Sequence, residues 1–96
     1  ITGGGFIENI PRALPENLGV SLDVSNVKVP EILSWLLEHS GMTKKEAYNV
    51  FNMGIGFIIV IAENETESAL NILKNLNTDA QIIGEVTAHQ GIEING

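Results

Sequence analysis

The sequence has 96 residues and no cysteine, so disulfide bonds, cysteine-ligated zinc sites and thiol nucleophiles are excluded together. Basic residues are also few, because 5 Lys and Arg against 12 Asp and Glu give a net charge of −7. The five lie scattered along the chain: Arg12, Lys28, Lys44, Lys45 and Lys74. Binding to a nucleic-acid backbone requires clustered positive charge. We therefore expect no nucleic-acid partner.

Long hydrophobic runs are missing as well. No stretch reaches the roughly 18 uninterrupted apolar residues that a membrane span needs, and no basic segment followed by an apolar one opens the sequence as in a secretory signal. We expect no membrane partner and a cytoplasmic location. The hydrophobic content of 44% is nevertheless too high for a disordered acidic tail, and the length fits one domain.

Apolar spacing in the first quarter of the sequence predicts a short helix and a strand. The helix covers residues 6–14 and is kinked or restarted at Pro11, because proline removes an internal hydrogen bond. Residues 18–24 alternate between apolar and polar, as in a half-buried strand. Its inward side chains are Leu18, Val20, Leu22 and Val24.

Two helices are expected next. The first begins at Pro30 and ends at Gly41, with Trp35 covering the core and an apolar stripe of Ile32, Leu33, Leu36 and Leu37. Thr43 and Glu46 have the spacing of a capping box that opens the second helix. The inward residues of this second helix are Ala47, Val50 and Phe51.

The second half predicts three strands and one more helix. Residues 57–62 are continuously apolar, as in a central strand covered on both faces. Asn64 and Glu67 indicate the start of a helix with Ala69, Leu70, Leu73 and Leu76 as its apolar positions, and two strands follow at residues 80–86 and 92–94. The fold class is an α/β or α+β sandwich with a mixed or antiparallel sheet.

The glycine-rich start is the first candidate site. Thr2, Gly3, Gly4 and Gly5 stand directly before a predicted helix, where bare amides and the helix N-terminus favour a phosphate group. A flexible turn or a cloning remnant is the alternative interpretation. Asn9 and Arg12 follow at helical spacing, and an arginine fork beside such a loop suits bidentate phosphate binding. Alternatively, Arg12 is solvated and pairs with Glu8 or Glu16.

A second motif lies at residues 51–56, where Asn52 precedes Gly54 and Gly56. The glycines allow close approach of a ligand or another chain segment, whereas a helix C-cap followed by a bulge is the structural alternative. The two histidines, His39 and His89, have no carboxylate at metal-ligand spacing, so we expect no zinc site and assign no metal ligand.

The run Ile-Thr-Gly-Gly-Gly-Phe-Ile-Glu-Asn-Ile-Pro-Arg at residues 1–12 closely resembles the C-terminal domain of the phosphoribosylformylglycinamidine cyclo-ligases, also called aminoimidazole ribonucleotide synthetases. Tyr48, the Phe-Asn-Met-Gly-Ile-Gly-Phe run at residues 51–57 and Ile-Gly-Glu-Val at residues 83–86 fall in the same order and spacing. The resemblance implies an ATP-dependent ring closure in purine biosynthesis, with ATP and Mg²⁺ bound mainly by an N-terminal domain that also forms a homodimer.

The resemblance also implies a fold and a site. It implies an α/β sandwich of partial ferredoxin-like topology, from which the first strand and helix and a preceding His are missing here. Residues 1–96 would then be a partial domain, the substrate-side part of a two-domain synthetase. The contacts to the phosphorylated substrate carried over from the family are Thr2, Gly3, Gly4, Gly5, Asn9, Arg12 and Asn52. No catalytic residue is assigned.

Two other interpretations of the sequence stay open. The first is that the chain belongs to another enzyme of the same superfamily: selenophosphate synthetase, thiamine-monophosphate kinase, the hydrogenase-maturation protein or formylglycinamidine ribonucleotide synthetase. The other is a small acidic binding module without enzymatic activity. For the cyclo-ligase reading we expect the partners to be the protein's own N-terminal domain and a second copy. Residues 1–96 alone are expected to be inactive and to self-associate through an exposed sheet edge.

Overall fold

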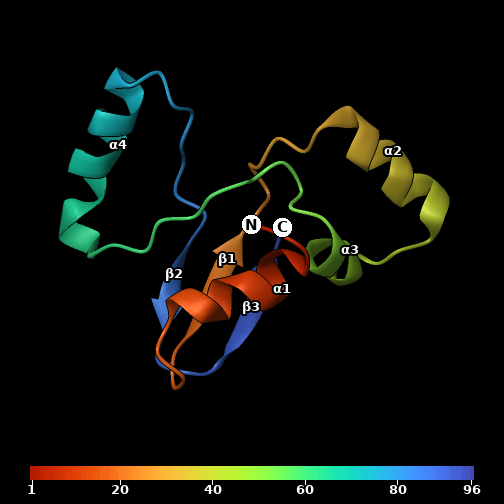
Figure 1. Cartoon of the computed structure of the whole chain (residues 1–96), viewed down its shortest axis with the longest axis horizontal. Helices are drawn as coiled ribbons and strands as arrows, with labels where there is room; N and C mark the ends of the chain where they lie inside the picture. The colour runs from red at the N-terminus through yellow and green to blue at the C-terminus, as the bar shows by residue number, and fades with distance from the viewer.

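A three-stranded mixed sheet forms the centre of the fold. The computed structural model describes residues 1–96, with four α-helices arranged around this sheet (Figure 1). Strand β1 (Gly19–Asp23) lies in the middle, antiparallel to β2 (Gly84–Thr87) and parallel to β3 (Gly91–Asn95). The last two strands follow each other in sequence but do not pair, because β1 lies between them. The predicted α+β class with a mixed sheet is confirmed.

The strand register separates an apolar face from a polar face. Cross-strand neighbours place Val20 between Val86 and Ile92 on one face. On the opposite face Ser21 lies between Glu85 and Glu93. Val20 and Leu22 are buried, so the alternation predicted for this strand is confirmed. Only the apolar face is covered by helices.

Helix α1 (Gly5–Asn9) and the 3₁₀ turn η1 (Ile10–Ala13) form the predicted interrupted helix. Pro11 lies in the first positions of η1, where the missing amide hydrogen removes no required hydrogen bond. Phe6 and Ile10 point from these two turns into the core. The sequence therefore located both the helix and its interruption.

Helix α3 (Lys44–Val50) packs against α1. Thr43 caps it, since the Oγ1 atom of Thr43 accepts a hydrogen bond from the Glu46 amide at 3.2 Å, as the capping box predicts. The rings of Phe6 and Tyr48 lie 5.0 Å apart with an interplanar angle of 42°. Ala47 and Tyr48 are buried. The inward placement predicted for Val50 is wrong, because the buried face of this short helix is centred near Ala47 and Tyr48 and leaves Val50 exposed.

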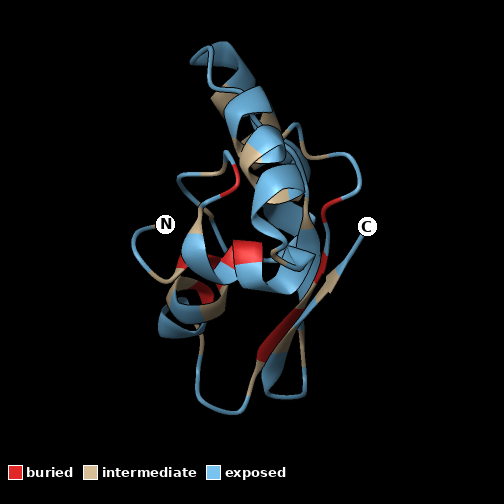
Figure 2. Cartoon of the chain, turned by 90° about the vertical axis from the view of Figure 1, so that its right-hand side faces the viewer, coloured by how far each residue is buried: buried red, intermediate tan, exposed pale blue.

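The hydrophobic core lies between β1 and the α1–α3 pair. Figure 2 shows the buried residues gathered around the central strand and the adjoining helices. Eight apolar side chains form it: Phe6, Ile10, Val20, Leu22, Val24, Ala47, Tyr48 and Met53. Only 10 of 96 residues are buried, so this core is small for the length of the chain.

Helices α2 (Glu31–Ser40) and α4 (Thr66–Asn75) project away from the sheet on opposite sides (Figure 1). Both helices were predicted, and α2 ends at Gly41 as expected, but neither contains a buried residue. The expectation that Trp35 covers the core is wrong, because its side chain is 53% exposed and stacks on His39 instead. None of the four helices has the length and apolar character needed to cross a membrane.

Residues 57–62 are not a strand, so the central strand predicted there is wrong. They run as a coil from α3 toward the 3₁₀ turn η2 (Glu63–Glu65), and η2 replaces the cap predicted at Asn64 (Figure 1). The sheet consists of β2, β1 and β3 alone, so residues 57–62 have no strand beside them. The strand predicted at residues 80–86 is likewise shorter and later, beginning only at Gly84.

Candidate functional site

The two glycine-containing motifs lie side by side although about fifty residues separate them in sequence. The backbone nitrogen of Ile1 donates a hydrogen bond of 2.5 Å to the carbonyl of Gly56. A Cβ atom on Gly5 would lie 2.9 Å from the carbonyl oxygen of Phe51. The fold therefore joins residues 2–5 and residues 51–56 into one region at the N-terminal end of α1.

The glycine loop at residues 2–5 is a tight turn into α1. Gly4 and Gly5 have φ angles of 98° and 57°, and the Gly5 amide donates to the carbonyl of Thr2 at 3.1 Å. The amides of Gly3 and Gly4 donate to no backbone carbonyl of the chain. These two amides are available to an anionic ligand, since backbone N–H groups bind phosphate oxygens well.

Asn9 braces the glycine loop from within α1. Its Oδ1 atom accepts a hydrogen bond from the Thr2 hydroxyl at 3.0 Å. Its Nδ2 atom donates to the carbonyls of Thr2, Gly3 and Gly5 at 3.0, 3.3 and 2.8 Å. One amide side chain thus fixes the path of the loop. The contact of Asn9 with a ligand stays a prediction.

We expect Asn9→Ala to destabilise the fold by about 1–2 kcal/mol, because it leaves three carbonyls without their shared donor. Urea unfolding followed by circular dichroism measures the change. Asn71→Ala on the exposed α4 is the matched control and should change the free energy of unfolding by less than about 0.5 kcal/mol. Equal midpoints for the two variants would show that Asn9 does not brace the loop.

Helix α3 supplies two further residues that the sequence did not single out as part of the site. In the amide orientation that satisfies both neighbours, with its oxygen and nitrogen exchanged, Asn49 donates to the Gly4 carbonyl at 3.1 Å and to the Glu8 carboxylate at 3.2 Å. The backbone of Tyr48 lies directly against Gly5. Both contacts depend on how α3 packs on α1, which periodicity does not specify. The only available signal was the place of Tyr48 in the family motif.

Burial raises the pKa of the Tyr48 phenol above its ordinary value of 10.0. Above pH 10 the unfolded chain loses this proton first, so the folded state binds more protons and stability falls as pH rises. We expect the free energy of unfolding to drop as the pH rises above about 10, and to drop less in Tyr48→Phe. Parallel pH profiles for the two proteins, measured by urea unfolding, would contradict this assignment.

The two remaining predicted site residues, Arg12 and Asn52, are exposed. Asn52 lies in the segment beside the glycine loop, whereas Arg12 follows α1 and lies at the end of that helix away from the loop. Arg12 lies in η1, and its side chain pairs with neither Glu8 nor Glu16. The Oδ1 atom of Asn52 accepts from the Gly54 amide at 2.8 Å, and the Ile55 amide donates to the Asn52 carbonyl at 3.0 Å. Asn52 therefore closes a turn after α3. Its contact with a ligand stays a prediction.

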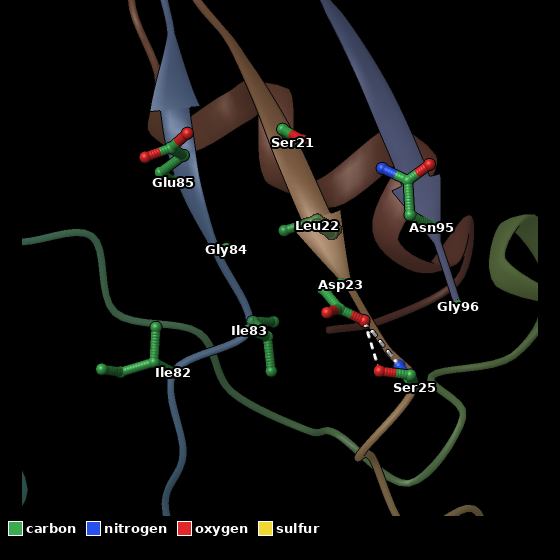
Figure 3. Close-up of a pocket in the computed structure, with 10 residues that line it drawn as sticks. All are labelled: Ser21, Leu22, Asp23, Ser25, Ile82, Ile83, Gly84, Glu85, Asn95 and Gly96. Carbon is green, nitrogen blue, oxygen red and sulfur yellow. Dashed lines mark hydrogen bonds between the residues drawn. The ribbon is translucent and has the colours of Figure 1, made fainter.

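Two surface depressions are lined by residues outside the glycine loop. Figure 3 shows one at the end of the sheet, where the Asp23 carboxylate accepts hydrogen bonds from the Ser25 hydroxyl and amide at 2.6 and 3.0 Å. These bonds, the hydroxyl bond first, lower the pKa of Asp23 below its ordinary value. The other depression lies between η1 and the start of β3. Neither of these two depressions is lined by any of the seven predicted contact residues.

Over residues 1–96 the sequence matches the family described as "AIR synthase related protein, C-terminal domain". The chain belongs to this family. A relative from Staphylococcus carnosus named phosphoribosylformylglycinamidine cyclo-ligase is 51% identical over 87 residues, which cover 91% of the chain and 25% of the relative. The resemblance read from the motifs at residues 1–12 and 51–57 is confirmed.

Two further relatives carry the same name. The one from Staphylococcus saprophyticus is 48% identical, and the one from Bacillus licheniformis is 42% identical. Each match covers 100% of the chain and 28% of the relative. The chain therefore spans about a quarter of the length of these curated relatives.

Proposed function

We propose that this chain is the C-terminal, substrate-side part of a phosphoribosylformylglycinamidine cyclo-ligase. The observation that carries the proposal is the 41–51% identity to proteins of that name along nearly the whole chain. The reaction is the ATP-dependent closure of formylglycinamidine ribonucleotide to aminoimidazole ribonucleotide. The full protein would act as a cytoplasmic homodimer.

The chemistry implied by the family requires a phosphorylated substrate to be held still. The terminal phosphoryl group of ATP passes to the formyl amide oxygen, a substrate nitrogen attacks the same carbon, and phosphate leaves as the imidazole ring closes. We assign to this chain the binding of a phosphate group by the amides of Gly3 and Gly4 and by the fork of Arg12. Holding the substrate in one orientation lowers the entropic part of the barrier.

The chain's own residues do not fit a magnesium site. No group of three or more His, Asp or Glu side chains lies close enough together to hold a metal ion. The proposal therefore places ATP and Mg²⁺ mainly on the N-terminal domain and derives no step through the metal from this chain. The glycine loop would face that domain across a cleft.

A chimeric enzyme tests the proposal. Residues 1–96 replace the matching quarter of the Staphylococcus carnosus relative, and aminoimidazole ribonucleotide formation is measured with ATP. We expect a rate within about tenfold of the parent enzyme, because the binding groups are retained. Two controls should be inactive. One is the parent enzyme lacking the replaced quarter of its sequence, and the other is residues 1–96 alone. A folded chimera that binds ATP but forms no product would refute the proposed function.

A further inference from the structure

Residues 57–62 form an exposed apolar segment with the composition of a strand. Phe57 is 84% exposed and Ile59 is 55% exposed. Aromatic and β-branched residues such as these are typical of strands. No backbone N–H or C=O group of residues 57–61 takes part in a backbone–backbone hydrogen bond. The segment therefore offers a row of free backbone groups on which an additional strand can pair.

Two contacts show which part of the molecule runs beside the start of this segment. The Gly5 position lies against the carbonyl of Phe51, and the nitrogen of Ile1 donates to the carbonyl of Gly56. As the residue number falls from 5 to 1, the number of the residue opposite rises from 51 to 56. The two stretches therefore run antiparallel, and Ile1 lies opposite the residue directly before Phe57.

Most of the length of each relative lies outside the region that this chain matches. The matches to the relatives from Staphylococcus carnosus and Staphylococcus saprophyticus cover 25% and 28% of those proteins. The family is described as a C-terminal domain, which places the remaining length on the side of Ile1. In a longer polypeptide the nitrogen of Ile1 is a backbone amide and donates the same hydrogen bond to Gly56. The residues before Ile1 therefore start beside residues 57–62.

We propose that the six residues directly before Ile1 in the full-length protein pair with residues 57–62 as an antiparallel strand. The proposal rests on the proposed function, because it treats this chain as the C-terminal part of a longer polypeptide. The contact between Ile1 and Gly56 sets the register. The residue next to Ile1 lies opposite Phe57, and the sixth residue before Ile1 lies opposite Ala62. Because this strand leads directly into residues 2–5, it also anchors the start of the glycine loop.

Connectivity and charge favour this occupant. A strand joined to the chain at Ile1 is held at a high effective concentration, and it pairs without the loss of translational freedom that a separate molecule has. A second copy would also bring another net charge of −7 to the contact. Pairing supplies hydrogen bonds to the free backbone groups of residues 57–61 and removes exposed apolar area from Phe57 and Ile59.

Amide hydrogen exchange, measured by mass spectrometry on the chimera and on residues 1–96 alone, tests whether the longer polypeptide covers residues 57–62. We expect these residues to exchange at least about tenfold more slowly in the chimera. A concentration series on residues 1–96 alone is the control, and exchange at residues 57–62 should not depend on concentration there.

A disulfide cross-link tests the identity and register of the paired segment. The chain has no cysteine of its own. In a chimera without other cysteines, Ile59→Cys and a cysteine at the third residue before Ile1 lie opposite each other in the proposed register. We expect mild oxidation to join them within one molecule. Ile32→Cys, at an exposed position of α2, is the matched control for Ile59→Cys and should form no such bond.

Three results would overturn the assignment. Equal exchange in the chimera and in residues 1–96 alone would mean that the longer polypeptide leaves residues 57–62 uncovered. Protection in the chimera without the cross-link would mean that another part of the polypeptide covers them. Protection of residues 1–96 alone that rises with concentration would identify a second copy as the occupant. Turnover separates this proposal from the ring closure, since an active chimera with unprotected residues 57–62 overturns the pairing alone.

Discussion

Gly5→Ala is expected to remove most of the stability of this chain. A Cβ atom at this position would overlap the carbonyl oxygen of Tyr48 and lie 2.9 Å from that of Phe51. Both are backbone atoms of α3 and its C-cap, so they move only if α1 separates from α3. The φ angle of 57° adds about 1–2 kcal/mol for any residue other than glycine.

The expected loss is at least about 4 kcal/mol, most of the roughly 5–10 kcal/mol that stabilises a domain of this size. Gly3→Ala in the same loop is the matched control, because a Cβ there meets nothing within 4 Å. It should change the free energy of unfolding by less than about 0.5 kcal/mol. Urea unfolding measured by circular dichroism separates the two. Similar stability in both variants would mean that α1 and α3 do not pack as described.

Local signals predicted most of the elements. The Thr43–Glu46 capping pair, Gly41 at the end of α2 and the alternation before Asp23 each act within a few residues, and the structure confirms all three. Residues 57–62 could not be predicted in this way. A continuous apolar run shows that a segment favours burial, but it does not show whether a partner strand is available.

The candidate site was predictable in composition but not in internal arrangement. The sequence identified residues 2–5 with Asn9 and Arg12 through the family motif. The sequence could not show that the Asn9 amide donates its hydrogen bonds to carbonyls of the loop, because those contacts depend on the turn at Gly4 and Gly5. The approach of Asn49 to Gly4 depends on tertiary packing between α1 and α3.

Arg12 is the only arginine in an acidic chain, and the proposed function depends on it more than on any other side chain. A charge-assisted hydrogen bond to phosphate contributes about 1.5–3 kcal/mol. We therefore expect Arg12→Ala to weaken substrate binding by about tenfold to about a hundredfold. Arg12→Lys should recover part of the affinity, since it keeps the charge but loses the bidentate fork. Lys74→Ala on α4 removes an equal charge and is the matched control.

The most direct measurement is calorimetric titration of formylglycinamidine ribonucleotide into the chimera, with and without Arg12→Ala. The account predicts a clear loss of substrate affinity in Arg12→Ala, with ATP affinity and the circular dichroism spectrum unchanged, and no loss in Lys74→Ala. An unchanged substrate affinity in folded Arg12→Ala would contradict the assignment of the substrate phosphate to Arg12 and the glycine loop at residues 2–5.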